Sequence, residues 1–146
     1  MPQITRDLNI IARCSYQFRT CLLSKHGISA AQAPYILHIC SKPGMSQEQL
    51  ANALNVNPSN ATRQLSLLEN QGYIKRVVSP HDKRIIELYP TEKGRQAAPV
   101  IKKVNQQWHD YLTQTFDPAS LLSLENMLGK MRSLALEWNA KGAVSP

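Results

Sequence analysis

Apolar residues in the middle of the chain recur first at helical spacing and then in the pattern of strands. One helical face is formed by Leu50, Ala53 and Leu54. A second face follows at steps of four and three residues: Ala61, Leu65 and Leu68. β-Branched and aromatic residues then dominate residues 73–78 and 85–89, on either side of a polar, turn-rich tip. Residues 46–94 are therefore predicted to form two short helices followed by a β-hairpin.

Helix-start signals precede both of these predicted helices. Ser46 and Gln49 have the spacing of a capping box, in which each side chain bonds the backbone N–H of the other residue. Asn57 can accept from the free N–H groups of the second helix, and Pro58 has the fixed φ of a first helical turn. With the apolar stripe buried, the outward residues at the start of this second helix are Ser59, Asn60, Thr62, Arg63 and Gln64. None of them is acidic, so this helix start can approach a polyanion.

The hairpin adds positive charge next to that helix. Its strands and tip carry four basic residues: Lys75, Arg76, Lys83 and Arg84. Basic side chains on a hairpin can contact the phosphates of a duplex. A helix with a polar, acid-free start followed by a basic hairpin therefore predicts binding to double-stranded DNA.

The total charge agrees with an anionic partner but does not locate the binding site. The chain carries 17 Lys and Arg against 10 Asp and Glu, which gives a net charge of +7. Residues 46–94 hold six basic and five acidic residues, so their own net charge is only +1. The DNA-binding prediction therefore depends on where the charged side chains lie.

Two helices are predicted before residue 46. Apolar spacing predicts the first over residues 5–25. Ser29 and Gln32 repeat the capping-box spacing and predict a second helix that ends near Lys42. Pro34 lies in or just after the first turn of that helix, which favours a start later than Ser29.

Two longer helices are predicted after the hairpin. Thr91 is the expected N-cap of the first, which runs to about Thr115, and Asp117 with Pro118 marks the start of the second. The last helix has an apolar face that repeats every three or four residues: Leu121, Leu124, Leu128, Met131, Ala135 and Trp138. We expect an apolar face of this extent on the last helix to be covered by another protein surface. Helices of the same subunit are one candidate, but we expect a second copy of the chain.

The motifs of residues 59–94 resemble the MarR family of bacterial winged-helix regulators, and the resemblance covers nearly the whole chain. The most diagnostic motif is the family's wing signature, an Asp-x-Arg followed by hydrophobic residues and then Thr-x-x-Gly: Asp82-Lys83-Arg84, Leu88 and Thr91-Glu92-Lys93-Gly94. Residues 59–63 resemble the start of the family's recognition helix, and residues 68–74 resemble its exit into the wing. Pro90 departs from the family pattern, in which an apolar residue usually precedes the threonine.

This resemblance implies an all-α fold with a small β-wing, made of a winged helix-turn-helix and a helical dimerisation layer. Residues 31–94 would form the DNA-binding domain, and residues 1–30 and 95–146 the dimerisation region. The implied function is that of a sequence-specific transcriptional regulator. It would act as a repressor, binding a pseudo-palindromic operator as a homodimer.

Two arginines have specific roles in this scheme. Arg63 would contact a base or a phosphate in the major groove. Arg84 would enter the minor groove, with its guanidinium oriented by Asp82. The alternative for Arg84 is an ion pair with Asp82 that only stabilises the hairpin, by about 0–1 kcal/mol at a surface. Both interpretations hold together if the pair orients Arg84 for binding.

The family resemblance also implies regulation by a small molecule. Family members commonly bind a small, often aromatic or anionic effector between the dimerisation layer and the DNA-binding lobe, which makes Arg13, Tyr35 and His38 candidate crevice residues. Some members instead sense peroxides or electrophiles through a cysteine of the first helix, where Cys14 lies. The alternative for Cys14 is a small buried hydrophobe.

Other function classes have little support in the sequence. Three cysteines, an odd number, argue against a disulfide framework, and the four histidines have no metal-ligand spacing. There is no Gly-rich phosphate loop or nucleophile elbow, so we expect neither an enzyme nor a cofactor. No signal peptide or membrane span is recognisable, which predicts a cytoplasmic protein. A non-specific architectural DNA-binding protein is the remaining alternative.

Overall fold

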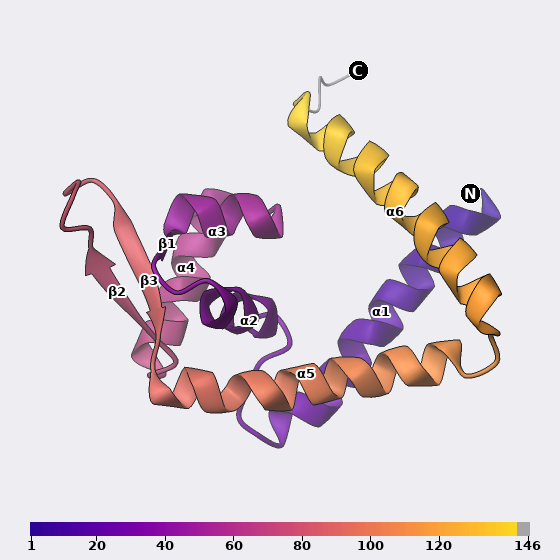
Figure 1. Ribbon diagram of the computed structural model, residues 1–146, viewed down its shortest axis with the longest axis horizontal. Coiled ribbons are helices and arrows are strands. Elements are labelled where there is room, and N and C mark those ends of the chain that lie inside the picture. The colour runs from indigo at the N-terminus through magenta and orange to yellow at the C-terminus, as the bar shows by residue number, and fades with distance from the viewer. Residues whose placement is uncertain (143–146) are drawn as a thin grey trace. The chain divides into compact units, whose positions relative to one another are not determined.

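The computed structural model describes residues 1–142, which form six helices and a small three-stranded sheet (Figure 1). The chain divides into two compact units, residues 1–108 and the residues from His109 onward. The elements are α1 (Gln3–Ser24), α2 (Ala33–Ser41), β1 (Met45–Ser46), α3 (Gln47–Leu54), α4 (Pro58–Asn70), β2 (Ile74–Val78), β3 (Ile86–Pro90), α5 (Glu92–Thr113) and α6 (Pro118–Ala140). The predicted all-α fold with a small β-wing is thereby confirmed.

The predicted hairpin is formed by β2 and β3, which pair antiparallel from Ile74 opposite Pro90 to Val78 opposite Ile86. We call β2, β3 and the residues 79–85 between them the wing. Figure 1 shows the wing tip extending beyond α3 and α4. Strand β1, which was not predicted, adds a third strand by pairing Met45 with Leu88.

Local capping fixes where α3 and α4 begin. The predicted capping box is present, since the backbone N–H of Gln49 donates to Ser46 Oγ (3.1 Å) and that of Ser46 donates to Gln49 Oε1 (2.9 Å). Asn57 Oδ1 accepts from the backbone N–H of Ser59 (2.8 Å), and Pro58 is the first residue of α4. Between the two helices Asn55 adopts a left-handed conformation with a φ of 52°. Asparagine tolerates that conformation better than most residues, which permits the sharp turn.

The second predicted capping box does not form. Helix α2 begins at Ala33, with Pro34 in its first turn, and its N-cap Gln32 makes no capping hydrogen bond. The Gln32 side chain is buried and donates instead to Gln71 Oε1 at the end of α4 (3.0 Å). A tertiary contact therefore replaces the local one.

The core of residues 1–108 is formed by α2, α3, α4 and the sheet, with Leu23 from the end of α1 and three residues of α5: Ala97, Ile101 and Val104. Ala61, Leu65 and Leu68 of α4 are buried as predicted. The prediction for α3 was wrong at Ala53, which is exposed, while its neighbour Ala51 is buried beside Leu50. Helix α3 contacts α2, α4 and both β1 and β3, so its buried face is turned relative to the simple periodic stripe.

Beyond residue 108, the fold contains the end of α5 and the whole of α6. Helix α5 ends at Thr113, two residues before the predicted end, and α6 begins after its N-cap Asp117 with Pro118 in the first turn. Within the described part of the chain, α6 has no buried residue. No helix among residues 1–142 is long and apolar enough to cross a membrane.

Candidate nucleic-acid interface

The start of α4 presents the predicted polar face to solvent. Ser59, Asn60, Thr62 and Arg63 are exposed, and Gln64 is half-buried. The hydroxyl of Thr62 donates to the backbone oxygen of Pro58 (3.0 Å), so it is engaged within its own helix. The first turn of α4 contains no acidic residue. This face therefore offers amide and guanidinium donors without a carboxylate that would repel phosphates.

Arg63 is held by a neighbour on the same face. Its Nη2 donates to Asn60 Oδ1 at 2.9 Å, a bond between residues three positions apart. Residues with this spacing are neighbours on a helix surface, so the contact needs no change of the helix. The two side chains that the sequence placed on the outward face thus form one hydrogen-bonded pair.

Arg76 was predicted to contact DNA, but its side chain bonds a carboxylate of the protein. Its Nε and Nη2 donate to Glu69 Oε1 (3.2 and 2.9 Å), and its backbone N–H donates to Glu69 Oε2 (3.0 Å). These bonds tie β2 to α4 and lower the pKa of the Glu69 carboxyl, chiefly through the side-chain hydrogen bond to Arg76. Two of the five guanidinium N–H groups of Arg76 thus bond Glu69, and a DNA contact by Arg76 stays a prediction.

The wing tip has the predicted Asp82–Arg84 pair. Arg84 donates from Nε to Asp82 Oδ1 (3.2 Å) and from Nη2 to Asp82 Oδ2 (3.1 Å), with its backbone N–H also on Oδ1 (3.0 Å). The hydrogen bonds from Arg84 lower the pKa of the Asp82 carboxyl. The Arg84 side chain is 89% exposed, and Lys83 beside it is exposed as well. The carboxylate therefore orients Arg84 without burying it.

The three candidate effector residues do not share one cavity. Tyr35 lines a cavity of about 200 Å³ between α2 and α4 whose other walls are Ala31, Pro34, Leu54, Val56, Asn60 and Gln64. Tyr35 is only 4% exposed, and its hydroxyl has no hydrogen-bond partner among the described residues. Burial raises the pKa of Tyr35, while the nearby charge of Arg63 acts in the opposite direction. Arg13 and His38 do not line this cavity: Arg13 is exposed on α1, and His38 Nδ1 lies 3.0 Å from the backbone oxygen of Pro34.

The cysteines are dispersed. Cys14 and Cys21 are exposed on α1, so the interpretation of Cys14 as a buried hydrophobe is wrong for the isolated chain. Cys40 is half-buried and donates weakly to the backbone oxygen of Gly94 (3.5 Å). Burial raises the pKa of the Cys40 thiol, which disfavours the reactive thiolate. Within residues 1–142 no group of His, Cys, Asp and Glu is arranged to hold a metal ion.

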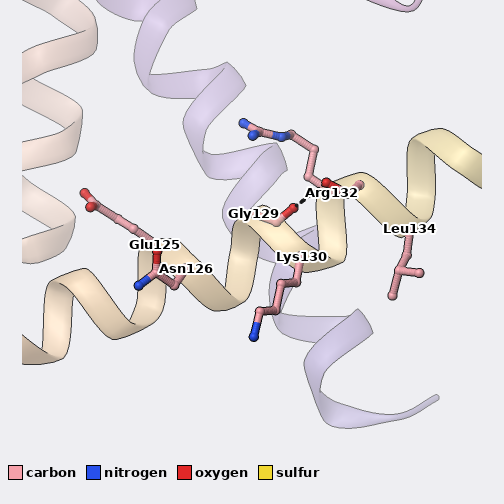
Figure 2. Close-up of a pocket in the computed structure, with 7 residues that line it drawn as sticks. Glu125, Asn126, Gly129, Lys130, Arg132 and Leu134 are labelled. Carbon is pink, nitrogen blue, oxygen red and sulfur yellow. Dashed lines mark hydrogen bonds between the residues drawn. The ribbon is translucent and has the colours of Figure 1, made fainter.

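A hollow on α6 is not a comparable site. Its lining residues all come from this one helix: Glu125, Asn126, Gly129, Lys130, Arg132, Ser133 and Leu134. Figure 2 shows the long side chains of Glu125, Arg132 and Lys130 pointing in different directions rather than toward a common centre. We therefore assign it no ligand.

One important residue was missed by the sequence analysis. Glu69 holds Arg76 across the turn from α4 to β2, although the two residues are seven positions apart. Within one helix, residues seven positions apart would be about 10 Å from each other, so the pair forms only because Glu69 lies on α4 and Arg76 on β2 after the turn.

In sequence the chain is similar to known transcriptional regulators. A family model described as "MarR family" matches residues 26–85. The HTH-type transcriptional regulator BilQ of Clostridium symbiosum is 30% identical over 117 residues, which cover 78% of this chain and 81% of BilQ. The uncharacterised HTH-type transcriptional regulator YybA of Bacillus subtilis is 26% identical, over 94% of this chain and 93% of YybA.

Solved structures of similar fold are transcriptional regulators as well. The transcriptional regulator SlyA superposes with a TM-score of 0.89 at 28% identity, covering 94% of this chain and 98% of SlyA. A putative MarR family regulator from Listeria monocytogenes was solved in complex with a 26mer DNA. It superposes with a TM-score of 0.91 at 27% identity, covering 100% of this chain and 99% of that one.

Proposed function

The chain belongs to the MarR family of DNA-binding transcriptional regulators, and we propose that it represses transcription by binding a pseudo-palindromic operator as a homodimer. The proposal rests above all on the exposed, acid-free start of α4, which carries Asn60 and Arg63 outward. The relative from Listeria monocytogenes that was solved with DNA supports it. In this scheme α4 reads the major groove, and the wing places Arg84 in the neighbouring minor groove.

Dimerisation is supported by the surface of the helices that would form the second region. In this scheme residues 31–94 bind DNA, and residues 1–30 and 95–146 form the dimer. The exposed apolar side chains of α6 are large and numerous: Leu122, Met127, Leu128, Met131, Leu134, Leu136 and Trp138. Water-exposed apolar surface of this extent favours association. A two-fold axis would then place two copies of α4 on successive major grooves.

Selection of DNA fragments from a randomised duplex pool tests this function. We expect enrichment of an inverted repeat whose half-sites are centred about 10 base pairs apart, since that is one helical turn. The dissociation constant for this repeat should be on the order of a thousandfold or more below that for random duplex. A non-specific architectural protein would enrich no sequence, and that result would refute the proposal.

An effector is proposed for the cavity beside Tyr35. Its mostly apolar walls and the unpartnered Tyr35 hydroxyl suit a single aromatic ring that carries an acceptor oxygen. Two of its walls, Asn60 and Gln64, belong to α4, so a ligand there would alter DNA affinity if it bound the free and DNA-bound forms unequally. We expect a panel of small aromatic acids to include one that weakens operator binding, and Tyr35→Phe to reduce that response.

Redox sensing through Cys14 is the alternative form of regulation. The exposure of Cys14 on α1 is compatible with oxidation. Stoichiometric peroxide should leave operator binding unchanged if the effector proposal is right. A reversible loss of binding that Cys14→Ser abolishes would favour the redox alternative instead.

A further inference from the structure

Three arginines lie on or near the proposed DNA face, and each is held by a different side chain. Arg76 bonds Glu69, and Arg84 bonds Asp82, so carboxylates orient both. Arg63 bonds the amide oxygen of Asn60. It takes part in none of the ion pairs found within residues 1–142. Because an amide is neutral, it orients the guanidinium without cancelling its charge.

The bond to Asn60 leaves the DNA-reading part of Arg63 available. A guanidinium has five N–H groups in a planar fork, and two of its edges present parallel pairs of donors. The contact to Asn60 uses Nη2 alone, at 2.9 Å. At least one parallel pair therefore remains for a second partner.

We propose that Asn60 is a positioning residue whose amide oxygen fixes the Arg63 guanidinium on the outward face of α4, where its remaining pair of N–H donors selects a guanine in the major groove. This inference rests on the proposed function, because it assumes that α4 enters that groove. Beyond the proposed function, this inference names one base that is read in each half-site, guanine, and the residue that controls its recognition, Asn60.

The chemistry of the base edges leads to guanine. Guanine presents two acceptors, N7 and O6, side by side in the major groove. Adenine presents one acceptor and one donor there, and cytosine presents a donor. A donor pair on Arg63 matches only the guanine edge fully. A good bidentate contact corresponds to roughly 5- to 150-fold discrimination.

The hydroxyl groups of Thr62 and Ser66 do not replace Asn60. Thr62 Oγ1 donates to the backbone oxygen of Pro58, and Ser66 Oγ donates to that of Thr62, each at 3.0 Å. Both hydroxyls are thus directed to their own helix. Without the Asn60 oxygen, Arg63 would keep its charge but lose its orientation, and a mobile arginine attracts all sequences alike.

The test uses the full chain and duplexes that differ only at the selected guanine pair. Dissociation constants are measured for the four base pairs and for random duplex, each over a range of salt concentrations. The variants are Asn60→Ala, Asn60→Asp, Arg63→Ala and the double variant, and Asn70→Ala serves as a control because Asn70 is exposed at the far end of α4. Asn60→Asp keeps the acceptor oxygen, and its added negative charge weakens all duplexes alike, so the preference ratio remains informative.

Wild type and Asn70→Ala should prefer guanine by roughly 5- to 150-fold. Asn60→Ala should lower this ratio at least about threefold, with the affinity for random duplex and the salt dependence unchanged within about twofold. Asn60→Asp should retain the ratio. In the Arg63→Ala background the Asn60→Ala change should have no further effect on it, since the two residues act as a unit.

Full guanine preference in Asn60→Ala would overturn the inference. So would a further loss of preference when Asn60→Ala is added to Arg63→Ala. If wild type selects an operator but shows no guanine preference that depends on Arg63, only this inference fails. If wild type selects no sequence at all, the proposed function fails with it.

Discussion

Two arginines near the proposed DNA face are each held by a carboxylate, Arg84 by Asp82 and Arg76 by Glu69. Asp82 and Arg84 are two positions apart in a turn, and their pairing was expected from the wing motif. The pair of Glu69 and Arg76 was not expected, because the path from α4 into β2 determines whether these residues meet. Contacts between residues close in sequence can be predicted from their spacing, whereas contacts between two elements depend on how the turn between them folds.

Replacing Glu69 with glutamine should destabilise the protein in a pH-dependent way. The folded state holds the pKa of Glu69 below its ordinary value of 4.5, so the charged form is favoured by folding. The stabilisation is therefore full above pH 4.5 and is lost as the pH falls through the lowered pKa. We expect Glu69→Gln to lower the free energy of unfolding by on the order of 1 kcal/mol at pH 7.

Urea unfolding at one protein concentration, from pH 7 down to pH 3, measures this effect, because an associating protein unfolds at a concentration-dependent midpoint. The difference between wild type and Glu69→Gln should shrink below pH 4.5. Glu125→Gln is the control, since Glu125 is exposed and takes part in none of the ion pairs of residues 1–142. A difference that stays constant down to pH 3 would show that the Glu69 charge does not stabilise the fold.

Asp82 and Arg84 should differ in how they affect DNA binding. Arg84→Ala removes a cation, so operator affinity should fall and the slope of log K against log salt should flatten by about one unit per lost phosphate contact in each subunit. Asp82→Asn keeps that cation but weakens its orientation. It should lower operator affinity with less change of slope than Arg84→Ala. Binding titrations at several salt concentrations measure both, and equal slopes in wild type and Arg84→Ala would contradict the wing contact.

At the scale of the elements, sequence signals succeeded where they were local. The capping box of α3 and the Asn57–Pro58 start of α4 form as predicted, because each involves residues within three positions. The capping box predicted from the same spacing at Ser29 does not form, because the Gln32 side chain donates to Gln71, 39 residues away. Strand β1 was missed because two residues carry too little pattern to predict a strand.

Gly94 illustrates a tertiary constraint on a helix. Alanine normally stabilises a helix interior relative to glycine. A Cβ at Gly94 would, however, overlap the backbone oxygen of Tyr73, which cannot move as a side chain can. We expect Gly94→Ala to lower the free energy of unfolding by about 2 kcal/mol.

Gly129 in α6 provides the matched control, since a Cβ there meets nothing within 4 Å. Gly129→Ala should raise the free energy of unfolding by about 0.5–1 kcal/mol. Chemical unfolding of both variants and wild type at one protein concentration makes the comparison. A Gly94→Ala variant as stable as wild type would mean that α5 and Tyr73 can separate at little cost.

At the scale of the whole molecule, the sequence predicted which surfaces are apolar better than where side chains converge. The periodic face of α6 was evident from the sequence: Leu128, Met131 and Trp138 are exposed in the single chain, and Leu121 and Leu124 are half-buried. The effector crevice was less predictable. Tyr35 faces a cavity shared with α4, whereas Arg13 and His38 do not line it. Periodicity gives the face of one helix, but a cavity needs several elements whose packing is set by the core.

The apolar face of α6 leads to the prediction about assembly. Leu124 and Leu128 belong to the predicted stripe, and within the described chain Leu124 is half-buried and Leu128 is exposed. Charged residues there would have to be desolvated in a dimer, so Leu124→Glu with Leu128→Glu should yield a folded monomer or an aggregate. A monomer presents one copy of α4 to a two-part operator. It should lose about 100-fold or more in affinity, because the second half-site is no longer bound intramolecularly.

Light scattering coupled to gel filtration gives the assembly state, circular dichroism confirms that the variant is folded, and titration of the selected operator gives the affinity. The control adds the same charge to polar residues of α6 that line the hollow of Figure 2, as Asn126→Glu with Ser133→Glu. This control should remain a dimer and bind the operator. If the leucine variant also stays dimeric and binds as wild type does, the stripe of α6 does not form the interface, and another apolar surface, such as that of α1, must join the two subunits.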